Sequence, residues 1–308
     1  MEITVIRSGI LTTVQDLGRM GQRGAGVPRG GAMDAFALRL ANLLVGNAEG
    51  AAALECTLLG PELVFSADTV IAVGGADFDG LAAWQPRAMR AGERVKLGVA
   101  NRGCRGYLAV AGGIDVPLVL GSRSTYLRGG FGGFKGRPLR DGDVVAVPDV
   151  ARKLADHWRI DPRILPAYSA APTVRVIRGA QMDEFGGALF AAEFKLLPQS
   201  DRMGLRLGGS KLMRIGGAGE LVSTAVTSGT IQVPPDGQPI VLMADAQTLG
   251  GYPQVAHVIS VDQPLIAQLR PGDRLKFAEV PLEEAHRLAL VRDHVIAILH
   301  EGLAQKFR

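Results

Sequence analysis

Polar side chains gather in one short segment of the second half of the chain, directly after an apolar run at 239–244 that is typical of a strand buried on both faces. Asp245 could act as a general base or orient an N–H group, and Gln247 could hydrogen-bond an amide. Backbone N–H groups of the paired glycines that follow could hold an oxyanion. We therefore predict a loop in which Asp245 and Gln247 are catalytic. The residues expected to bind substrate there are Thr248, Gly250, Gly251 and Tyr252. The alternative is an ordinary strand–loop–strand with a capped turn.

A second polar group lies near the N-terminus, in the segment TTVQDLGR at 12–19. Asp16 and Arg19 place a carboxylate and a guanidinium close together at the end of an expected strand. Because a guanidinium offers a planar fork to a carboxylate, we predict Gln15 and Arg19 as substrate-binding residues and Asp16 as a catalytic one. The alternative is a surface Asp–Arg pair, which is common in proteins.

Two further segments could contact an anion. Arg202, in SDRMG at 200–204, is predicted as a second anion contact and a substrate-binding residue; the alternative is an exposed arginine on a β-turn. The segment GGAMD at 30–34 precedes an expected helix, and the N–H groups at a helix start favour anions. We favour Asp34 as the N-cap there, since a capping carboxylate itself occupies some of those donors.

Familiar nucleotide and hydrolase motifs are absent from the sequence. The glycine-rich segment STYLRGGFGGFKG at 124–136 fits neither the dinucleotide-binding pattern nor a P-loop. The stretch at 204–211 also misses the P-loop pattern, because Lys211 does not directly follow a glycine. No G-x-S-x-G element of a serine hydrolase occurs. ATP binding by a known loop is therefore not expected.

Composition favours a globular protein that acts on small molecules. The 308 residues are 47% hydrophobic and 21% charged. Aromatic residues make up only 5%, and the net charge of +4 is scattered along the chain, so we expect no nucleic-acid partner. Since no long apolar run or signal-peptide pattern occurs, we expect no membrane association and a cytoplasmic location.

Metal and thiol chemistry are not expected either. The histidines show no ligand spacing with cysteine or aspartate. Cys56 and Cys104 lie far apart and outside any C-x-x-C pattern, so we expect both to be reduced core residues.

Short apolar runs broken by glycine predict a mainly β fold with a few short helices. Helices are expected from Asp34 to Gly46 and from 281 to 303. Three similar turn sequences hint at two related β halves. They are RAGERV at 90–95, RDGDV at 140–144 and RPGDRL at 270–275.

Five longer motifs resemble a known family. They are TTVQDLGRMGQRGAGVPRGGAMD with ALRLANLLVGN, YLAVAGGIDVP, STYLRGGFGGFKGRPLRDGD, SDRMGLRL and IQVPPDGQPIVLMADAQTLGGYP, which span Leu11 to roughly Phe277. On these motifs the chain resembles the family variously called the C subunit of 5-oxoprolinase, the second subunit of allophanate hydrolase and biotin-dependent carboxyltransferase. The resemblance implies two cyclophilin-like β-barrel domains, at 1–165 and at 166–308 with a terminal helix, and a ligand cleft between them. The proline-containing stretch at 149–172 is the expected connection.

This resemblance also implies a function. The first hypothesis is a subunit of an ATP-dependent 5-oxoprolinase that converts 5-oxoproline to glutamate together with two other subunits. ATP would be used by the complex and is not assignable to this subunit.

Two alternatives remain open. One is a carboxyltransferase that moves CO₂ from biotin to urea or a related amide; biotin would come from another chain, since no Met-Lys-Met site occurs here. The other is a non-enzymatic antagonist of a kinase inhibitor. The chain departs from the commoner family pattern at Leu249, where threonine is usual, and at Gln254, where a basic residue is usual.

Overall fold

The computed structural model of the protein describes residues 1–150, 158–216, 219 and 221–307. The chain forms two compact units. Unit 1 comprises Met1–Met20, Gly30–Pro166 and Asp293–Arg308, and unit 2 comprises Gly21–Arg29 and Ala167–Arg292. Part of the predicted connection, residues 151–157, lies outside the described residues. Whether each half folds as a domain, with a boundary at 165/166, stays a prediction.

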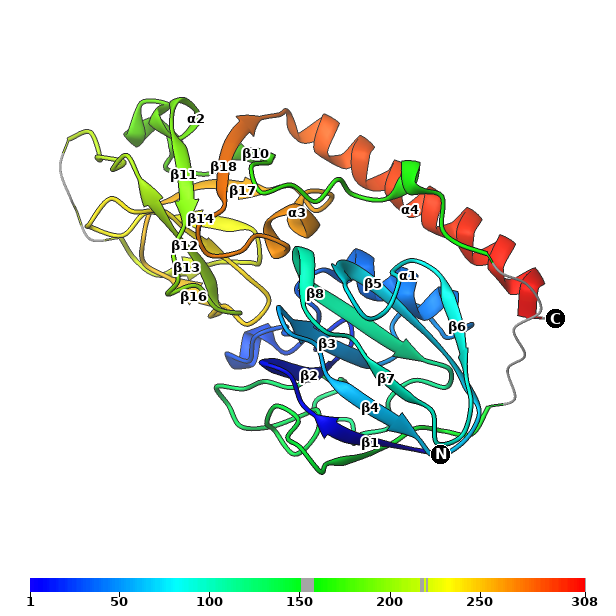
Figure 1. Cartoon of the computed structure of the whole chain (residues 1–308). Helices are drawn as coiled ribbons and strands as arrows, with labels where there is room; N and C mark the ends of the chain where they lie inside the picture. Colours follow the sequence, from blue (N-terminus) through cyan, green and yellow to red (C-terminus); the bar gives the residue numbers. More distant parts are fainter. Residues whose placement is uncertain (151–157, 217–218, 220, 308) are drawn as a thin grey trace. The chain divides into compact units, whose positions relative to one another are not determined.

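Described strands of unit 1 form two antiparallel sheets (Figure 1). The larger sheet contains, in spatial order, β2 (Leu11–Gln15), β3 (Ala53–Thr57), β8 (Ala100–Val110), β5 (Thr69–Phe78) and β6 (Pro86–Met89). The smaller sheet contains β7 (Arg94–Lys96), β4 (Glu62–Phe65), β1 (Glu2–Arg7) and β9 (Val144–Ala146). The long central strands β5 and β8 pair over most of their length, from Ile71↔Val110 to Phe78↔Ala100.

Alternation along β8 explains why this sheet is buried on both faces. Leu108 and Val110 join the hydrophobic core that includes Leu63 of the smaller sheet. Tyr107 and Ala109, which alternate with them in sequence, join the cluster formed with helix α1 (Ala35–Leu44). Successive strand side chains point to opposite faces, so both faces must be apolar.

Helix α1 follows the sequence-based expectation. The Asp34 carboxylate accepts a hydrogen bond of 2.9 Å from the backbone N–H of Ala37 and caps the helix. Gly46, just after the helix, has a left-handed φ of 72°. The predicted helix and its N-cap are confirmed.

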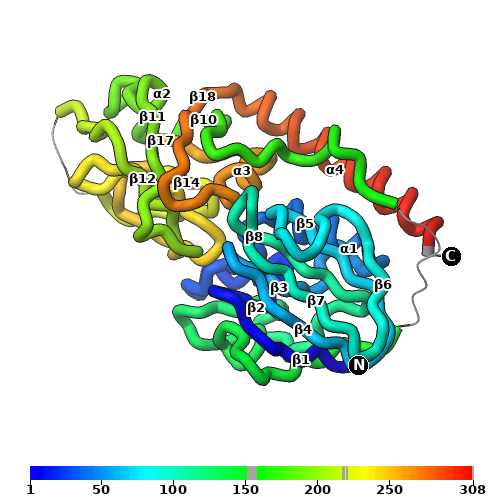
Figure 2. The backbone as a smooth tube through the Cα atoms, in the orientation of Figure 1, coloured from blue at the N-terminus to red at the C-terminus, as the bar shows by residue number. Residues whose placement is uncertain are grey.

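Seven described strands of unit 2 close into a barrel. Their order is β10 (Thr173–Arg178), β17 (Gln254–Val258), β14 (Thr230–Gln232), β15 (Ile240–Leu242), β12 (Gly204–Gly209), β11 (Glu193–Leu196) and β18 (Arg274–Glu279). Figure 2 shows how β10 and β18, far apart in sequence, run side by side as the parallel pair that completes the barrel. A separate two-stranded ribbon joins β13 (Thr224–Ala225) to β16 (Leu249–Gly250).

The remaining described helices are short, apart from the last α-helix. They are η1 (Arg23–Ala25), η2 (Pro162–Ile164), η3 (Met182–Phe185), α2 (Ala188–Ala191), α3 (Gln263–Ala267), α4 (Leu282–Ala304) and η4 (Gln305–Phe307). The mainly β fold and the C-terminal helix predicted from sequence are confirmed. Within the described residues, no helix combines the length and apolar character needed to cross a membrane.

The three similar turn sequences adopt one local structure. In each, the acidic side chain at the fourth position accepts a hydrogen bond from the backbone N–H of the arginine at the first. The bonds are Arg90–Glu93 at 2.9 Å, Arg140–Asp143 at 2.7 Å and Arg270–Asp273 at 2.8 Å. The glycine at the third position has φ of 76°, 85° or 99°, a region that favours glycine. The turns are thus encoded locally, twice in unit 1 and once in unit 2.

Asp143 gives a pH-dependent stability prediction. Hydrogen bonds from the Arg137 guanidinium, at 2.7 and 2.8 Å, lower the pKa of Asp143, helped by the N–H of Arg140. Because the folded-state pKa lies below the unfolded value of about 3.9, this contribution is present above that pH and is lost as the pH falls through the folded pKa. Asp143→Asn should therefore lower the free energy of unfolding by about 1–2 kcal/mol at pH 7.

The difference between wild type and variant should shrink below about pH 4 in urea unfolding curves. Asp115→Asn is the control, since Asp115 is 55% exposed and lies 3.5 Å from Arg123. If Asp143→Asn lowers the free energy of unfolding equally at pH 7 and pH 3.5, the charge of Asp143 plays no part in its contribution to stability.

Candidate functional site

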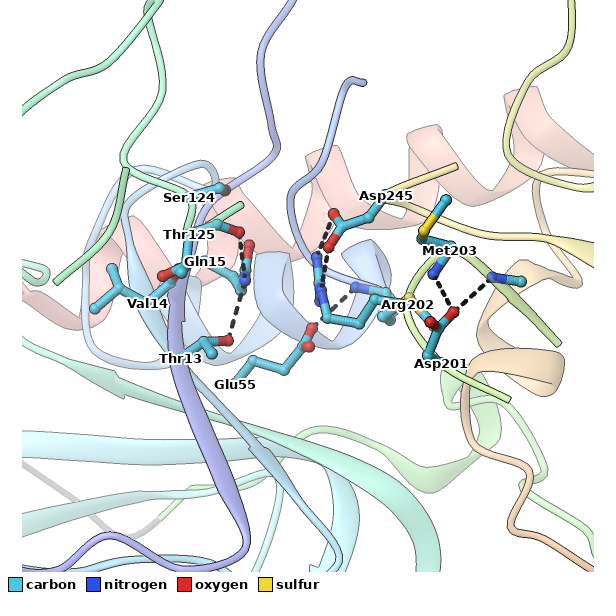
Figure 3. Close-up of polar contacts among 12 residues, drawn as sticks. Thr13, Val14, Gln15, Glu55, Ser124, Thr125, Asp201, Arg202, Met203 and Asp245 are labelled. Carbon is cyan, nitrogen blue, oxygen red and sulfur yellow. Dashed lines mark hydrogen bonds and ion pairs between the residues drawn. The ribbon is translucent and has the colours of Figure 1, made fainter. Parts of the chain in front are cut away.

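Arg202 and Asp245, predicted from separate segments, form one buried ion pair in unit 2 (Figure 3). Arg202 Nε lies 2.8 Å from Asp245 Oδ2, and Arg202 Nη2 lies 3.0 Å from Oδ1. The side chains are 6% and 5% exposed. The Asp245 N–H donates to the Arg202 carbonyl at 2.9 Å, and the Met243 N–H donates to the Met203 carbonyl at the same distance. The alternative of an exposed arginine on a β-turn is wrong.

This pair fixes where the loop after β15 begins. A carboxylate and a guanidinium removed from water are stable only when they are hydrogen-bonded, and a bidentate pair gives each carboxylate oxygen a donor and uses two N–H groups of the guanidinium. Asp201 organises the other side, because its Oδ1 accepts from the N–H groups of Met203 at 2.8 Å and Gly204 at 3.1 Å. The turn at 201–204 and the residues 243–245 are therefore joined through backbone and side chains together.

The predicted site residues of the loop differ in how far they are exposed. Gln247 is exposed, Thr248 is partly buried, and Tyr252 is 47% exposed. The Thr248 carbonyl accepts from the Val226 N–H at 3.1 Å, and Gly250 pairs with Thr224 across the ribbon of β13 and β16. The ribbon therefore holds the backbone of the loop, while the side chain of Gln247 lies in contact with solvent.

Two glutamines that were not predicted as site residues support this ribbon. The Gln232 side chain, 1% exposed, donates to the Tyr252 carbonyl at 3.2 Å. A Cβ added at Gly250 would lie 2.5 Å from Gln232 Nε2, so a larger residue there would displace the Gln232 amide. Gln254 donates to Thr224 Oγ1 at 2.9 Å. The available signal was an amide side chain at one end of each of two short strands.

In unit 1, Asp16 is the centre of a buried hydrogen-bond network. Its Oδ1 accepts from the Gly18 N–H at 2.7 Å, Ser122 Oγ at 2.7 Å and Ser124 Oγ at 2.5 Å. Its Oδ2 accepts from the Arg123 N–H at 2.6 Å. The carboxylate thus ties the end of β2 to the segment 122–124. The network is a sufficient structural reason for an aspartate at this position; its catalytic role stays a prediction.

Gln15 and Arg19 are buried beside the same segment. Gln15, 0% exposed, donates from Nε2 to Thr13 Oγ1 at 3.0 Å and to the Thr125 carbonyl at 3.3 Å (Figure 3). Arg19, 1% exposed, donates to the Ser124 carbonyl and lies 4.9 Å from the centre of the Phe131 ring. The alternative of a surface Asp–Arg pair is wrong. The structure brings Gln15, Asp16 and Arg19 together around 122–125.

Glu55 is a buried carboxylate that the sequence did not single out. Its Oε2 accepts from the Met33 N–H at 3.0 Å and from the Tyr107 hydroxyl at 2.8 Å, and the same hydroxyl accepts from the Asp34 N–H at 2.7 Å. Burial, and next the charge of Glu55, raise the pKa of Tyr107 well above its usual value. This network holds the backbone that enters α1, so the segment 30–34 is a capped helix entry.

Metal ligands, cysteines and a hollow are the remaining features of the described residues. In that part of the chain, no group of three or more His, Cys, Asp or Glu side chains is placed to hold a metal. Cys56 and Cys104 are buried thiols outside any disulfide, as predicted, and burial raises the pKa of the Cys56 thiol to about 12. A hollow of about 540 Å³ in unit 1 is lined by residues that include Gln85, Arg87 and Trp158, and by none of the predicted site residues.

Comparison with known proteins gives consistent matches over most of the chain. The family described as carboxyltransferase domain, subdomain A and B, matches residues 25–279. The chain is 42% identical to the C subunit of 5-oxoprolinase from Escherichia coli (strain K12), covering 92% of this chain and 93% of that protein. It is 40% identical to the corresponding 5-oxoprolinase protein of Haemophilus influenzae, covering 90% of each.

A solved structure of similar fold is that of the K. lactis urea amidolyase. It matches with a TM-score of 0.90 and 32% identity over 97% of this chain. This chain spans only 20% of the length of that protein.

The buried ion pair predicts that substitutions of Arg202 and Asp245 have strongly coupled effects on the free energy of unfolding. Arg202→Met or Asp245→Leu alone should lower the free energy of unfolding by about 3–5 kcal/mol, because each leaves an uncompensated buried charge. The double variant should lose less than the sum of the two by more than about 1 kcal/mol. Urea unfolding of the four proteins measures this coupling.

Arg178→Ala serves as the control, since Arg178 is 46% exposed in its ion pairs and should change stability by less than about 1 kcal/mol. Strictly additive losses for Arg202 and Asp245 would mean that the two side chains stabilise the protein independently.

Proposed function

Since the chain belongs to the family described as carboxyltransferase domain, subdomain A and B, we propose that it is a subunit of an ATP-dependent 5-oxoprolinase that converts 5-oxoproline to glutamate. The observation that carries this proposal is the 42% identity over 93% of a protein named as the C subunit of 5-oxoprolinase. Such a match covers the loops as well as the scaffold, whereas a fold alone does not specify a reaction.

The proposed reaction overcomes the low reactivity of a lactam. ATP phosphorylates the lactam oxygen, water adds to the carbon, and the carbon–nitrogen bond breaks as the ring nitrogen takes a proton. A second water then releases phosphate from the resulting acyl phosphate, leaving glutamate, ADP and phosphate. The protein must orient the lactam and stabilise the charge that develops at its carbon and oxygen.

In this proposal the loop that follows Asp245 contacts the lactam. The exposed Gln247 hydrogen-bonds the amide, with Thr248 and Tyr252 beside it. The N–H groups of Gly250 and Gly251 are the proposed oxyanion donors. Because both oxygens of Asp245 accept from Arg202, Asp245 serves first to fix the start of the loop.

Partners are part of the proposal. Relatives that are 40–42% identical are named as one subunit of 5-oxoprolinase, which supports a complex with other subunits, two of them in our proposal. The sequence carries no known nucleotide-binding loop, so ATP is used by the complex without being assigned to this subunit.

A second candidate is a biotin-dependent carboxyltransferase acting on urea or a related amide. The TM-score of 0.90 to the K. lactis urea amidolyase favours it. The ring of biotin is itself a ureido group, so an amide-binding loop would suit this reaction too. Biotin would be supplied by another chain, and turnover would depend on carboxybiotin instead of on 5-oxoproline.

Dependence on partners is the first test. The purified chain should release no phosphate from ATP in the presence of 5-oxoproline, whereas the chain reconstituted with its two proposed partner proteins should release phosphate and form glutamate. The measurement is a coupled phosphate assay with and without 5-oxoproline. Robust turnover by the isolated chain would contradict the obligate complex; urea- and carboxybiotin-dependent turnover would favour the second candidate.

Gln247→Ala tests the loop without disturbing the fold. Gln247 is exposed, so the free energy of unfolding should change by less than about 0.5 kcal/mol. If Gln247 stabilises the reacting amide, kcat/KM of the reconstituted complex should fall roughly 100-fold. Gln199→Ala, at another exposed glutamine of unit 2, should leave kcat/KM unchanged. Wild-type kcat/KM in Gln247→Ala would remove this residue from the mechanism.

A further inference from the structure

Arg23 is held beside the proposed catalytic loop by a segment of the N-terminal half. Residues Gly21–Arg29 belong to unit 2, although the sequence on either side of them belongs to unit 1. Arg23 Nη2 donates a hydrogen bond to the Val226 carbonyl. The N–H of Val226 donates to the Thr248 carbonyl at 3.1 Å. Val226, directly after β13, therefore connects the Arg23 guanidinium to the backbone of the loop at Thr248.

A second arginine of the same segment, Arg29, interacts electrostatically with the first. Arg29 is exposed at the surface, yet partial desolvation, and next the positive charge of Arg23, lower its pKa. In the part of the chain that the structure describes, Arg23 contacts no carboxylate. Two guanidinium groups held near each other repel, and an anion placed between them would turn that repulsion into attraction.

The other arginines predicted to bind an anion are differently placed. The fork of Arg202 is directed at Asp245, and Arg19 is 1% exposed with a hydrogen bond to the Ser124 carbonyl. Arg23 is only partly buried and has further N–H donors beyond the one used on Val226. A guanidinium with spare donors at a partly exposed site is well suited to a carboxylate or phosphate.

We propose that Arg23, assisted by Arg29, binds a small oxyanion beside the loop that carries Gln247 and Thr248. The ligand is a carboxylate or a phosphate, and its identification as the carboxylate of 5-oxoproline or the phosphate derived from ATP rests on the proposed function. Arg23 is then the residue that anchors the charged end of the ligand, while the loop faces the lactam.

Binding to the purified full chain tests this directly. Isothermal titration would use 5-oxoproline, 2-pyrrolidinone, which is the same lactam without the carboxylate, and inorganic phosphate. Arg23→Ala should raise the Kd for the oxyanion probe roughly 10- to 100-fold, because a charge-assisted hydrogen bond is lost. Arg23→Lys should restore part of the affinity, since it keeps the charge without the fork. Arg206→Ala, at an exposed arginine of β12, is the matched control and should bind as wild type.

The probes separate the two sources of the anion. A loss confined to 5-oxoproline, with 2-pyrrolidinone unaffected, assigns the carboxylate; a loss confined to inorganic phosphate assigns the phosphate. Unchanged affinity for both anions in Arg23→Ala, or no binding of either anion by the wild-type chain, would overturn the proposal.

The outcome is distinguishable from a failure of the proposed function. If the wild-type complex turns over 5-oxoproline and Arg23→Ala does so with unchanged KM and kcat, the anion site is wrong and the function stands. If the wild-type complex is inactive while Arg23→Ala weakens phosphate binding by the chain, the anion site stands and the function fails.

Discussion

A bidentate ion pair between Arg202 and Asp245 lies under the loop on which the proposed chemistry depends. Both groups are withdrawn from water, so neither tolerates the loss of the other. The pair, with the backbone hydrogen bonds beside it, fixes the end of β15 against the turn at 201–204. A loop that starts from a fixed point can present its side chains with little loss of conformational freedom on binding, which favours both affinity and catalysis.

Unit 1 uses the same principle at Asp16. Its carboxylate accepts four hydrogen bonds from Ser122, Arg123, Ser124 and Gly18, and Arg19 reaches the Ser124 carbonyl. Polar residues that a sequence pattern would assign to a substrate are here bound first to the chain itself. Burial requires this, because an unpaired carboxylate in the interior is unstable. Gln247, by contrast, is exposed.

The chain is similar to two proteins that have different names and very different lengths. Nearly the whole chain matches the Escherichia coli 5-oxoprolinase protein, and it also matches a fifth of the K. lactis urea amidolyase. The reaction proposed for this chain opens a lactam, which is an amide, and the name of the K. lactis protein refers to urea. A common barrel can serve different reactions when the loops differ.

Sequence alone determined the features that depend on neighbours along the chain. Glycine and an acidic residue at fixed spacing predicted the turns at 90–93, 140–143 and 270–273, and Asp34 marked the start of α1. It also determined the family. Tertiary structure decided the partners of the buried charges. Asp245 meets Arg202 from 43 residues away, Asp16 meets Ser122 from 106 residues away, and residues 21–29 belong to unit 2. Local spacing fixes backbone geometry, whereas the partner of a buried charge is set by which distant strands the hydrophobic core brings together.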